Sequence, residues 1–163
     1  MRFCVTRQAT TPFFAVGHRF VISDEAGEPR YRVADRLRAA TATAVFRDTA
    51  GKQLLALERR HLLLGMGIFT VREGATVGGV QVQRDLTSDG PGLRIRAPDE
   101  LELVGDLGRH EYYLMRRGQI IVYVSRRWCG QRRHTYGVDL PDEADHPLLL
   151  ACVLALDMLF LYE

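Results

Sequence analysis

The sequence predicts an all-β protein with one central helix, a closed antiparallel β-barrel of about 12 strands that encloses an apolar C-terminal α-helix. Three observations predict this fold class. Short segments of alternating apolar and polar residues, separated by turn residues, fill residues 2–138. One turn pattern within them occurs twice. The chain then ends in an apolar run over residues 148–162.

Length and composition are typical of a single globular domain spanning residues 1–163. Of the 163 residues, 47% are hydrophobic and 26% are charged, which excludes disordered, collagen-like and coiled-coil classes. The net charge of +2 gives no general attraction to polyanions, so no nucleic-acid partner is expected.

Two hairpins of the same design begin the predicted sheet, one over residues 18–33 and one over residues 41–59. In each, an alternating strand runs into an Asp-x-x-Gly turn and alternation resumes after it. The aspartate carboxylate suits the first turn position because it accepts a backbone N–H two residues ahead, and glycine accepts the left-handed conformation. The residues predicted to hold these turns are Asp24, Gly27, Asp48 and Gly51.

Further hairpins follow, with a turn at Gly74 and another at Arg117-Gly118. At about 8–12 residues per strand and turn, the chain before the apolar run supplies roughly 12 to 18 strands. So many strands in one open sheet would leave exposed edges, which closure into a barrel abolishes.

The C-terminal run predicts a helix over residues 146–161. Acidic residues precede His146-Pro147, as is typical of a helix start with proline in the first turn. Because the run is apolar on every face, we expect the helix to thread the barrel. Asp157 then lies deep in the core, and we expect an inward arginine or backbone amides to satisfy its carboxylate.

Three cysteines lie far apart and show no paired spacing: Cys4, Cys129 and Cys152. This spacing argues against zinc ribbons, CxxC sites and a disulfide scaffold, and it favours a reducing compartment. Residues 1–12 contain no secretory signal, and the apolar run is too short to cross a bilayer. The sequence therefore predicts a cytoplasmic protein that contacts membranes, if at all, only peripherally.

Candidate catalytic and metal-binding patterns are weak. The histidines form no metal-binding motif, and in a strand His110 and Glu111 would point to opposite faces. The serines lack the context of a nucleophile elbow, and the glycine pairs lack that of a phosphate loop. No metal, cofactor or catalytic residue is predicted, although four clustered carboxylates leave the binding of a divalent cation as an open alternative. These are Asp99, Glu100, Glu102 and Asp106.

Arginines gather around a predicted turn near residue 130. Arginine binds phosphate through two hydrogen bonds, and tryptophan favours the bilayer interface, so the cluster suits an anionic lipid headgroup. The predicted lipid-binding residues are Arg126, Arg127, Trp128, Arg132 and Arg133.

The chain resembles the LURP-one-related, or tubby C-terminal-like, superfamily, to whose fold the phospholipid scramblases belong. The resemblance lies in the hairpins FVISDEAGEPRYRV and VFRDTAGKQLLAL and in the closing segment YGVDLPDEADHPLLLACVLALDMLF. It implies a 12-stranded barrel around a central helix, in a superfamily where some members bind phosphoinositides or act at membranes.

Three functional hypotheses follow from these observations. The first is a non-catalytic binding or scaffolding module that recognises an anionic phospholipid or phosphoinositide through a basic rim. The second is a scramblase-like or lipid-transferring membrane protein, which requires the apolar helix to leave the barrel. The third is an enzyme whose site is assembled from distant strands, which requires a polar pocket with perturbed ionisable groups.

Overall fold

A computed structural model describes residues 1–8, 19–38, 41–63, 65–83, 92–96, 100–130 and 134–160. The described chain is all-β with one α-helix at its C-terminal end, as predicted. The strands are β1 (Arg2–Gln8), β2 (Arg19–Asp24), β3 (Pro29–Arg38), β4 (Thr41–Asp48), β5 (Gln53–Leu62), β6 (Gly65–Arg72), β7 (Ala75–Gln83), β8 (Gly92–Arg96), β9 (Glu100–Asp106), β10 (Glu111–Arg116), β11 (Gln119–Ser125) and β12 (Thr135–Asp139). The helices are the short 3-10 helix η1 (Arg126–Cys129) and α1 (His146–Phe160).

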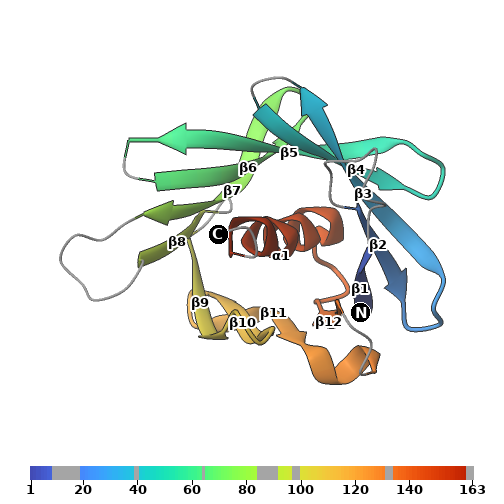
Figure 1. Ribbon diagram of the computed structural model, residues 1–163. Helices are drawn as coiled ribbons and strands as arrows, with labels where there is room; N and C mark the ends of the chain where they lie inside the picture. The colour runs from blue at the N-terminus through green and yellow to red at the C-terminus, as the bar shows by residue number, and fades with distance from the viewer. Residues whose placement is uncertain are drawn as a thin grey trace.

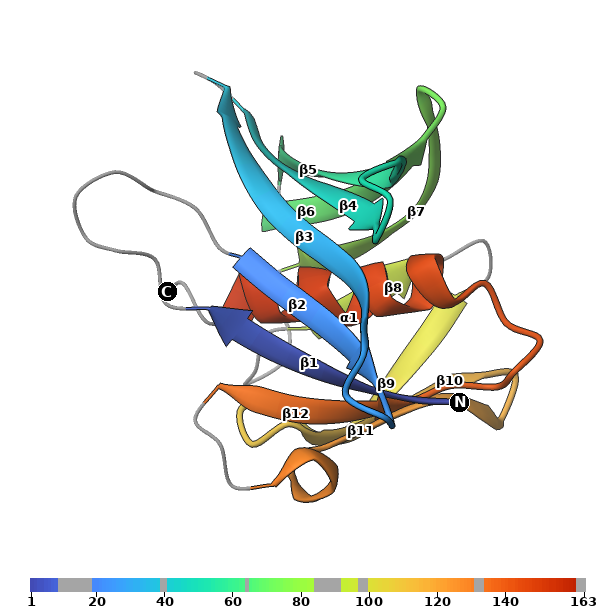
Figure 2. The same cartoon turned by 90° about the vertical axis from the view of Figure 1, so that its right-hand side faces the viewer.

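Strands that follow one another along the chain are antiparallel neighbours, and β1 pairs with β12 as well as with β2. Figure 1 shows the sheet curving around α1, which lies at the centre of the fold. In the side view of Figure 2, β1, β2 and β12 run along α1.

The predicted fold class needs a correction in one respect: the strand order returns from β12 to β1, but the backbone ladders around this ring are very uneven in length. The ladder between β3 and β4 covers eight register pairs, whereas that between β11 and β12 covers three and that between β8 and β9 covers two. The cause is the register of the strands, since β8 pairs five residues with β7 but only two with β9, and β12 pairs five with β1 but only three with β11. We therefore describe one curved antiparallel sheet wrapped around α1.

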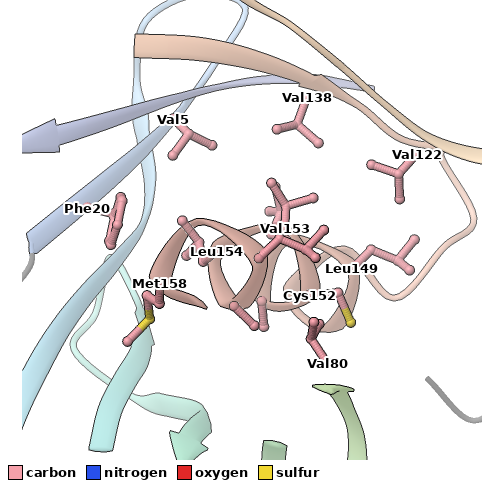
Figure 3. Close-up of a cluster of buried hydrophobic side chains, with 14 of the residues drawn as sticks. Val5, Phe20, Val80, Val122, Val138, Leu149, Cys152, Val153, Leu154 and Met158 are labelled. Carbon is pink, nitrogen blue, oxygen red and sulfur yellow. The ribbon is translucent and has the colours of Figure 1, made fainter. Parts of the chain in front are cut away.

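The core lies between the inner face of this sheet and α1. Alternate residues of several strands point inward, such as Phe3 and Val5 on β1 or Val122 and Val124 on β11. Figure 3 shows side chains of α1 facing apolar side chains from several strands. Every residue from Leu148 to Leu159 is buried, which confirms that the helix is enclosed on all its faces.

Asp145 fixes the start of α1. Its Oδ1 accepts the backbone N–H of Leu148 at 3.2 Å, and its carbonyl accepts that of Leu149. The same carboxylate forms an ion pair with Arg72 of β6 at 2.9 Å, which ties the helix start to the sheet.

The two repeated turns are each held by their aspartate and their glycine. Asp24 Oδ1 accepts the N–H groups of Ala26 and Glu28, both at 3.0 Å, and Asp48 Oδ1 accepts that of Lys52 at 2.9 Å. The glycines adopt the left-handed conformation, with φ of 84° at Gly27 and 83° at Gly51.

Candidate functional site

Asp157 lies in the C-terminal half of α1, and its side chain is 3% exposed. Tyr136 of β12 places its hydroxyl 2.5 Å from Oδ2, and His110 places Nε2 3.0 Å from Oδ1. The prediction of an arginine or backbone amides was therefore wrong. Two side chains from sequence-distant positions meet the carboxylate instead, one on each oxygen. We call Asp157, His110 and Tyr136 the Asp157 cluster.

His110 reaches the core because it is a turn residue. It precedes β10, has a φ of 53°, and donates its backbone N–H to the carbonyl of Leu107. The left-handed conformation turns the imidazole inward, where it stacks on the Tyr136 ring with centroids 4.4 Å apart. The prediction that His110 sits in a strand with Glu111 was therefore wrong.

A turn signal before His110 was present in the sequence. Asp106 Oδ1 accepts the backbone N–H of Arg109 at 3.0 Å, so an aspartate again holds a turn that contains a glycine, Gly108. Gly105 lets β9 approach β10 closely here, since a Cβ on it would lie 2.5 Å from the Glu111 carbonyl oxygen.

Electrostatics fix the role of Tyr136 in the cluster. Burial, and next the negative charge of Asp157, raise the pKa of the Tyr136 hydroxyl well above its ordinary value. The same two causes raise the pKa of Tyr112, which is also buried. Tyr136 therefore stays protonated at neutral pH and donates its hydrogen bond to Asp157.

The Asp157 cluster lies in the wall of a pocket of about 220 Å³. The wall combines the end of β1, the start of β2, the β9–β10 turn, η1, the start of β12 and α1. Its residues, which define the Asp157 pocket, are Arg7, Phe20, His110, Arg126, His134, Thr135, Tyr136 and Asp157.

The charged groups of the pocket favour an anion. Arg7 and Arg126 carry permanent positive charges, and His134 adds a third basic side chain. Both carboxylate oxygens of Asp157 already have hydrogen-bond partners within the cluster, His110 and Tyr136. Arg126 lines the pocket and is exposed, so its guanidinium can offer N–H donors to an acidic group such as a phosphate. Among the described residues no group of side chains has the arrangement of a metal site.

Only part of the predicted lipid-binding set lies at this pocket. Arg126 lines it, whereas Arg127 extends outward, 86% exposed and 3.9 Å from Glu111. Arg132 and Arg133 lie outside the described residues. Arg7, His110 and His134 were not in the predicted set, because β1, the β9–β10 turn and the start of β12 meet only in the folded chain.

Trp128 of η1 packs against the outer face of the sheet. The ring lies edge-on to Tyr123, with centroids 4.7 Å apart, and the Arg2 guanidinium lies 4.5 Å from its centroid. Gly137 of β12 makes room for it, since a Cβ there would lie 2.8 Å from Trp128 Cβ. Trp128 therefore anchors η1 to the sheet.

A disulfide joins Cys4 of β1 to Cys129 at the end of η1, with Cα atoms 5.9 Å apart. The prediction that the cysteines form no disulfide was wrong. Their spacing carried no signal, because 125 residues separate the two positions and only the pairing of β1 with β12 brings them together. Cys152 of α1 is a buried free thiol.

Other candidate residues lie apart from this pocket. Glu100 and Glu102 of the acidic stretch lie on β9, and Asp106 ends that strand; Asp99 lies outside the described residues. His61 is exposed on β5.

An antiparallel sheet wrapped around a buried C-terminal helix defines a class of all-β domains with a helical core. Within that class, the chain belongs to the LURP-one-related family, whose model matches residues 2–157. The comparisons with curated proteins and with solved structures gave no significant match. Neither helix in the described part of the chain has the length and apolar character required to span a membrane.

Proposed function

We propose that this LURP-one-related protein is a non-catalytic binding module that recognises the phosphate of an anionic phospholipid headgroup in the Asp157 pocket. One observation carries the proposal: Arg7, Arg126 and His134 line a single pocket, although they come from three separate parts of the chain. Arginine is suited to phosphate because its planar guanidinium donates two parallel hydrogen bonds.

The surroundings of the pocket support an anionic membrane as the source of the phosphate. Arg109 and Arg127 flank His110 and Arg126 in sequence, and their side chains are 85% and 86% exposed. Basic residues near an anionic surface contribute about 1 kcal/mol each, which would concentrate the protein at the membrane.

Binding should be weak and sensitive to salt. A hydrogen bond to a charged group contributes about 1.5–3 kcal/mol. The two hydrogen bonds of one bidentate arginine therefore supply roughly 3–6 kcal/mol, which corresponds to a Kd between roughly 10 mM and 0.05 mM before association costs weaken it further. Exposed charges are screened over about 10 Å at about 0.1 M salt, so physiological salt should reduce binding.

The polar chemistry of the pocket favours binding over catalysis. The hypothesis of an enzyme required a polar pocket with a perturbed ionisable group, and Tyr136 is such a group. Its raised pKa makes it a persistent hydrogen-bond donor rather than a base near neutral pH. Tyr136 therefore does not act as a proton acceptor, and the Asp157 cluster has a structural role in the pocket wall.

Sedimentation with vesicles tests the proposal. Vesicles of phosphatidylcholine alone, with phosphatidylserine, or with a phosphoinositide are mixed with the protein at low and at physiological salt. We expect binding to the anionic vesicles at low salt and none to the neutral ones. Arg126→Glu should abolish it, whereas Lys52→Glu should not, because Lys52 lies beside Pro147 at the other end of α1.

Soluble ligands separate a lipid from a free phosphate. Inorganic phosphate and a soluble inositol phosphate are titrated by calorimetry into the same protein. Weak binding of both, with tighter binding to vesicles, supports a membrane headgroup. Tight binding of a soluble phosphate without vesicle binding would identify the ligand as a free phosphate compound rather than a lipid. Binding of neither, or equal losses in the two charge-reversed variants, would overturn the proposal.

A further inference from the structure

The Cys4–Cys129 disulfide lies on the outer face of the sheet. Phe3 and Val5 point into the core, so Cys4 between them points outward. Cys4 is in register with Gly137 of the neighbouring strand β12. The missing side chain at Gly137 leaves a hollow that η1 covers, since a Cβ there would lie 3.3 Å from Cys129 Sγ.

The disulfide constrains η1 rather than the strands beneath it. β1 and β12 are already joined by five register pairs, so their pairing does not depend on the disulfide. By contrast, η1 has four residues and none of them is buried. Trp128, the disulfide and two backbone hydrogen bonds at its start hold η1 in place. The Arg126 N–H donates to Glu111, and the Arg127 N–H donates to the Ser125 hydroxyl.

The position of Arg126 therefore depends on how η1 is held. Arg126 begins η1 and lines the Asp157 pocket, and Cys129 ends η1. Opening the disulfide removes the covalent tie three residues away from Arg126. The guanidinium would then sample a wider range of positions around the pocket, which increases the entropy cost of binding an anion there.

The third cysteine does not compete for exchange with this pair. Cys152 is buried in α1, and burial raises the pKa of its thiol to about 12. It therefore stays protonated and shielded at neutral pH, whereas Cys4 and Cys129 are both partly exposed.

We infer that Cys4–Cys129 is a reversible thiol–disulfide exchange site for a dithiol reductant, and that reduction releases η1 and weakens anion binding in the Asp157 pocket. The regulatory part of this inference rests on the proposed function. One thiolate of the reductant attacks a sulfur of the pair, which forms a mixed disulfide and expels the other sulfur as a thiolate. The second reductant thiolate then closes the reductant's own disulfide. Overall the protein gains two electrons and two protons, and the disulfide becomes two thiols.

Trp128 provides a direct readout, because it is the only tryptophan in the chain and belongs to η1. The folded protein is titrated with dithiothreitol, accessible thiols are alkylated and counted by mass spectrometry, and tryptophan emission is recorded. We expect labelling of Cys4 and Cys129 but not Cys152, together with an emission shift to longer wavelength as the ring is hydrated.

Two variants control for effects on folding. The Cys4→Ser/Cys129→Ser double variant should show the emission of the reduced protein with or without dithiothreitol. Cys152→Ala keeps the exchanging pair and should respond as the natural chain does. Circular dichroism establishes that each protein remains folded, and reduction of the natural chain tests the inference without any substitution.

Vesicle binding measures the regulation. We expect the reduced protein and the double serine variant to bind anionic vesicles about tenfold more weakly than the oxidised protein, a factor that corresponds to about 1.4 kcal/mol. A pair that resists dithiothreitol in the folded protein, or reduction without a change in Trp128 emission, would overturn the exchange site and the release of η1. Equal binding by both redox forms would overturn the regulation. If neither form binds while Trp128 responds, the proposed function fails and the exchange site is supported.

Discussion

At the scale of single residues, the Asp157 cluster explains how a carboxylate is accommodated inside an apolar helix. A buried carboxylate without partners costs several kcal/mol, so each oxygen needs a donor. Tyr136 and His110 supply one donor position each. His110 stacks on Tyr136, so the two partners also position each other.

The hydrogen bond from Tyr136 can be tested by a double-mutant cycle. Tyr136→Phe removes only the hydroxyl and leaves Asp157 Oδ2 without its donor. We expect the free energy of unfolding in urea to fall by about 1–3 kcal/mol. In an Asp157→Leu background the same change should cost much less, because the carboxylate is gone.

One outcome of the cycle would contradict this interaction. Equal losses from Tyr136→Phe in both backgrounds would mean that the two side chains do not interact energetically. Tyr113→Phe is a matched control, because Tyr113 is on the same sheet but only partly buried, and we expect it to lose little stability in either background.

At the scale of elements, the start of α1 combines a helix cap with an ion pair. Burial on its own would raise the pKa of the Asp145 carboxyl, but the hydrogen bonds from Arg72 and the Leu148 N–H outweigh it and lower the pKa. A carboxyl whose pKa is lower in the folded chain than in the unfolded one stabilises the fold in its ionised form. Its contribution is present above the unfolded pKa, near 4, and is lost as the pH falls through the folded pKa.

Asp145→Ala tests this account. We expect the free energy of unfolding at pH 7 to fall by about 1 kcal/mol, the usual cost of removing a helix cap. The difference between the variant and the natural chain should shrink as the pH falls below about 4, since protonation removes the same interactions. Urea unfolding from pH 3 to pH 7 measures both effects.

Glu143→Ala provides the comparison, because Glu143 is an exposed acidic residue two positions earlier. It should leave stability nearly unchanged at every pH. A pH-independent loss in Asp145→Ala would mean that the charge of Asp145 does not contribute.

At the scale of the whole molecule, the sequence predicted what local chemistry determines. Alternation placed the strands, and the apolar run placed the buried helix, because both depend on neighbouring residues. The Asp24 and Asp48 turns were predictable for the same reason. The uneven lengths of the backbone ladders were not predictable, because they depend on how far neighbouring strands overlap in register.

The site could not be predicted from the sequence because its parts come together only in the fold. His110 and Asp157 are 47 residues apart, and the inward direction of His110 follows from its left-handed turn conformation. Cys4 and Cys129 meet only after β1 has paired with β12 and η1 has folded over Gly137. Of the predicted arginines that the structure describes, Arg126 lines the pocket and Arg127 extends away from it.

The enclosure of α1 predicts that the sheet cannot fold without it. Deleting residues 146–163 would expose the inner face of the sheet, which now packs against a helix buried from Leu148 to Leu159. Each Å² of apolar surface returned to water costs about 25 cal/mol, and strands all around the sheet contribute to that surface. This cost should exceed the free energy of unfolding of a typical domain, which is about 5–15 kcal/mol.

We therefore expect the truncated chain to lack cooperative unfolding in urea and to show poorly dispersed amide resonances by NMR. A chain that lacks only residues 161–163 is the matched control, because α1 ends at Phe160 and stays whole in it, so this chain should fold. The full truncation also removes Asp157, which leaves Tyr136 and His110 facing the interior without their shared acceptor. A monomeric truncated chain with a sharp unfolding transition would show that the strands close on their own, and that α1 fills the sheet without being required to form it.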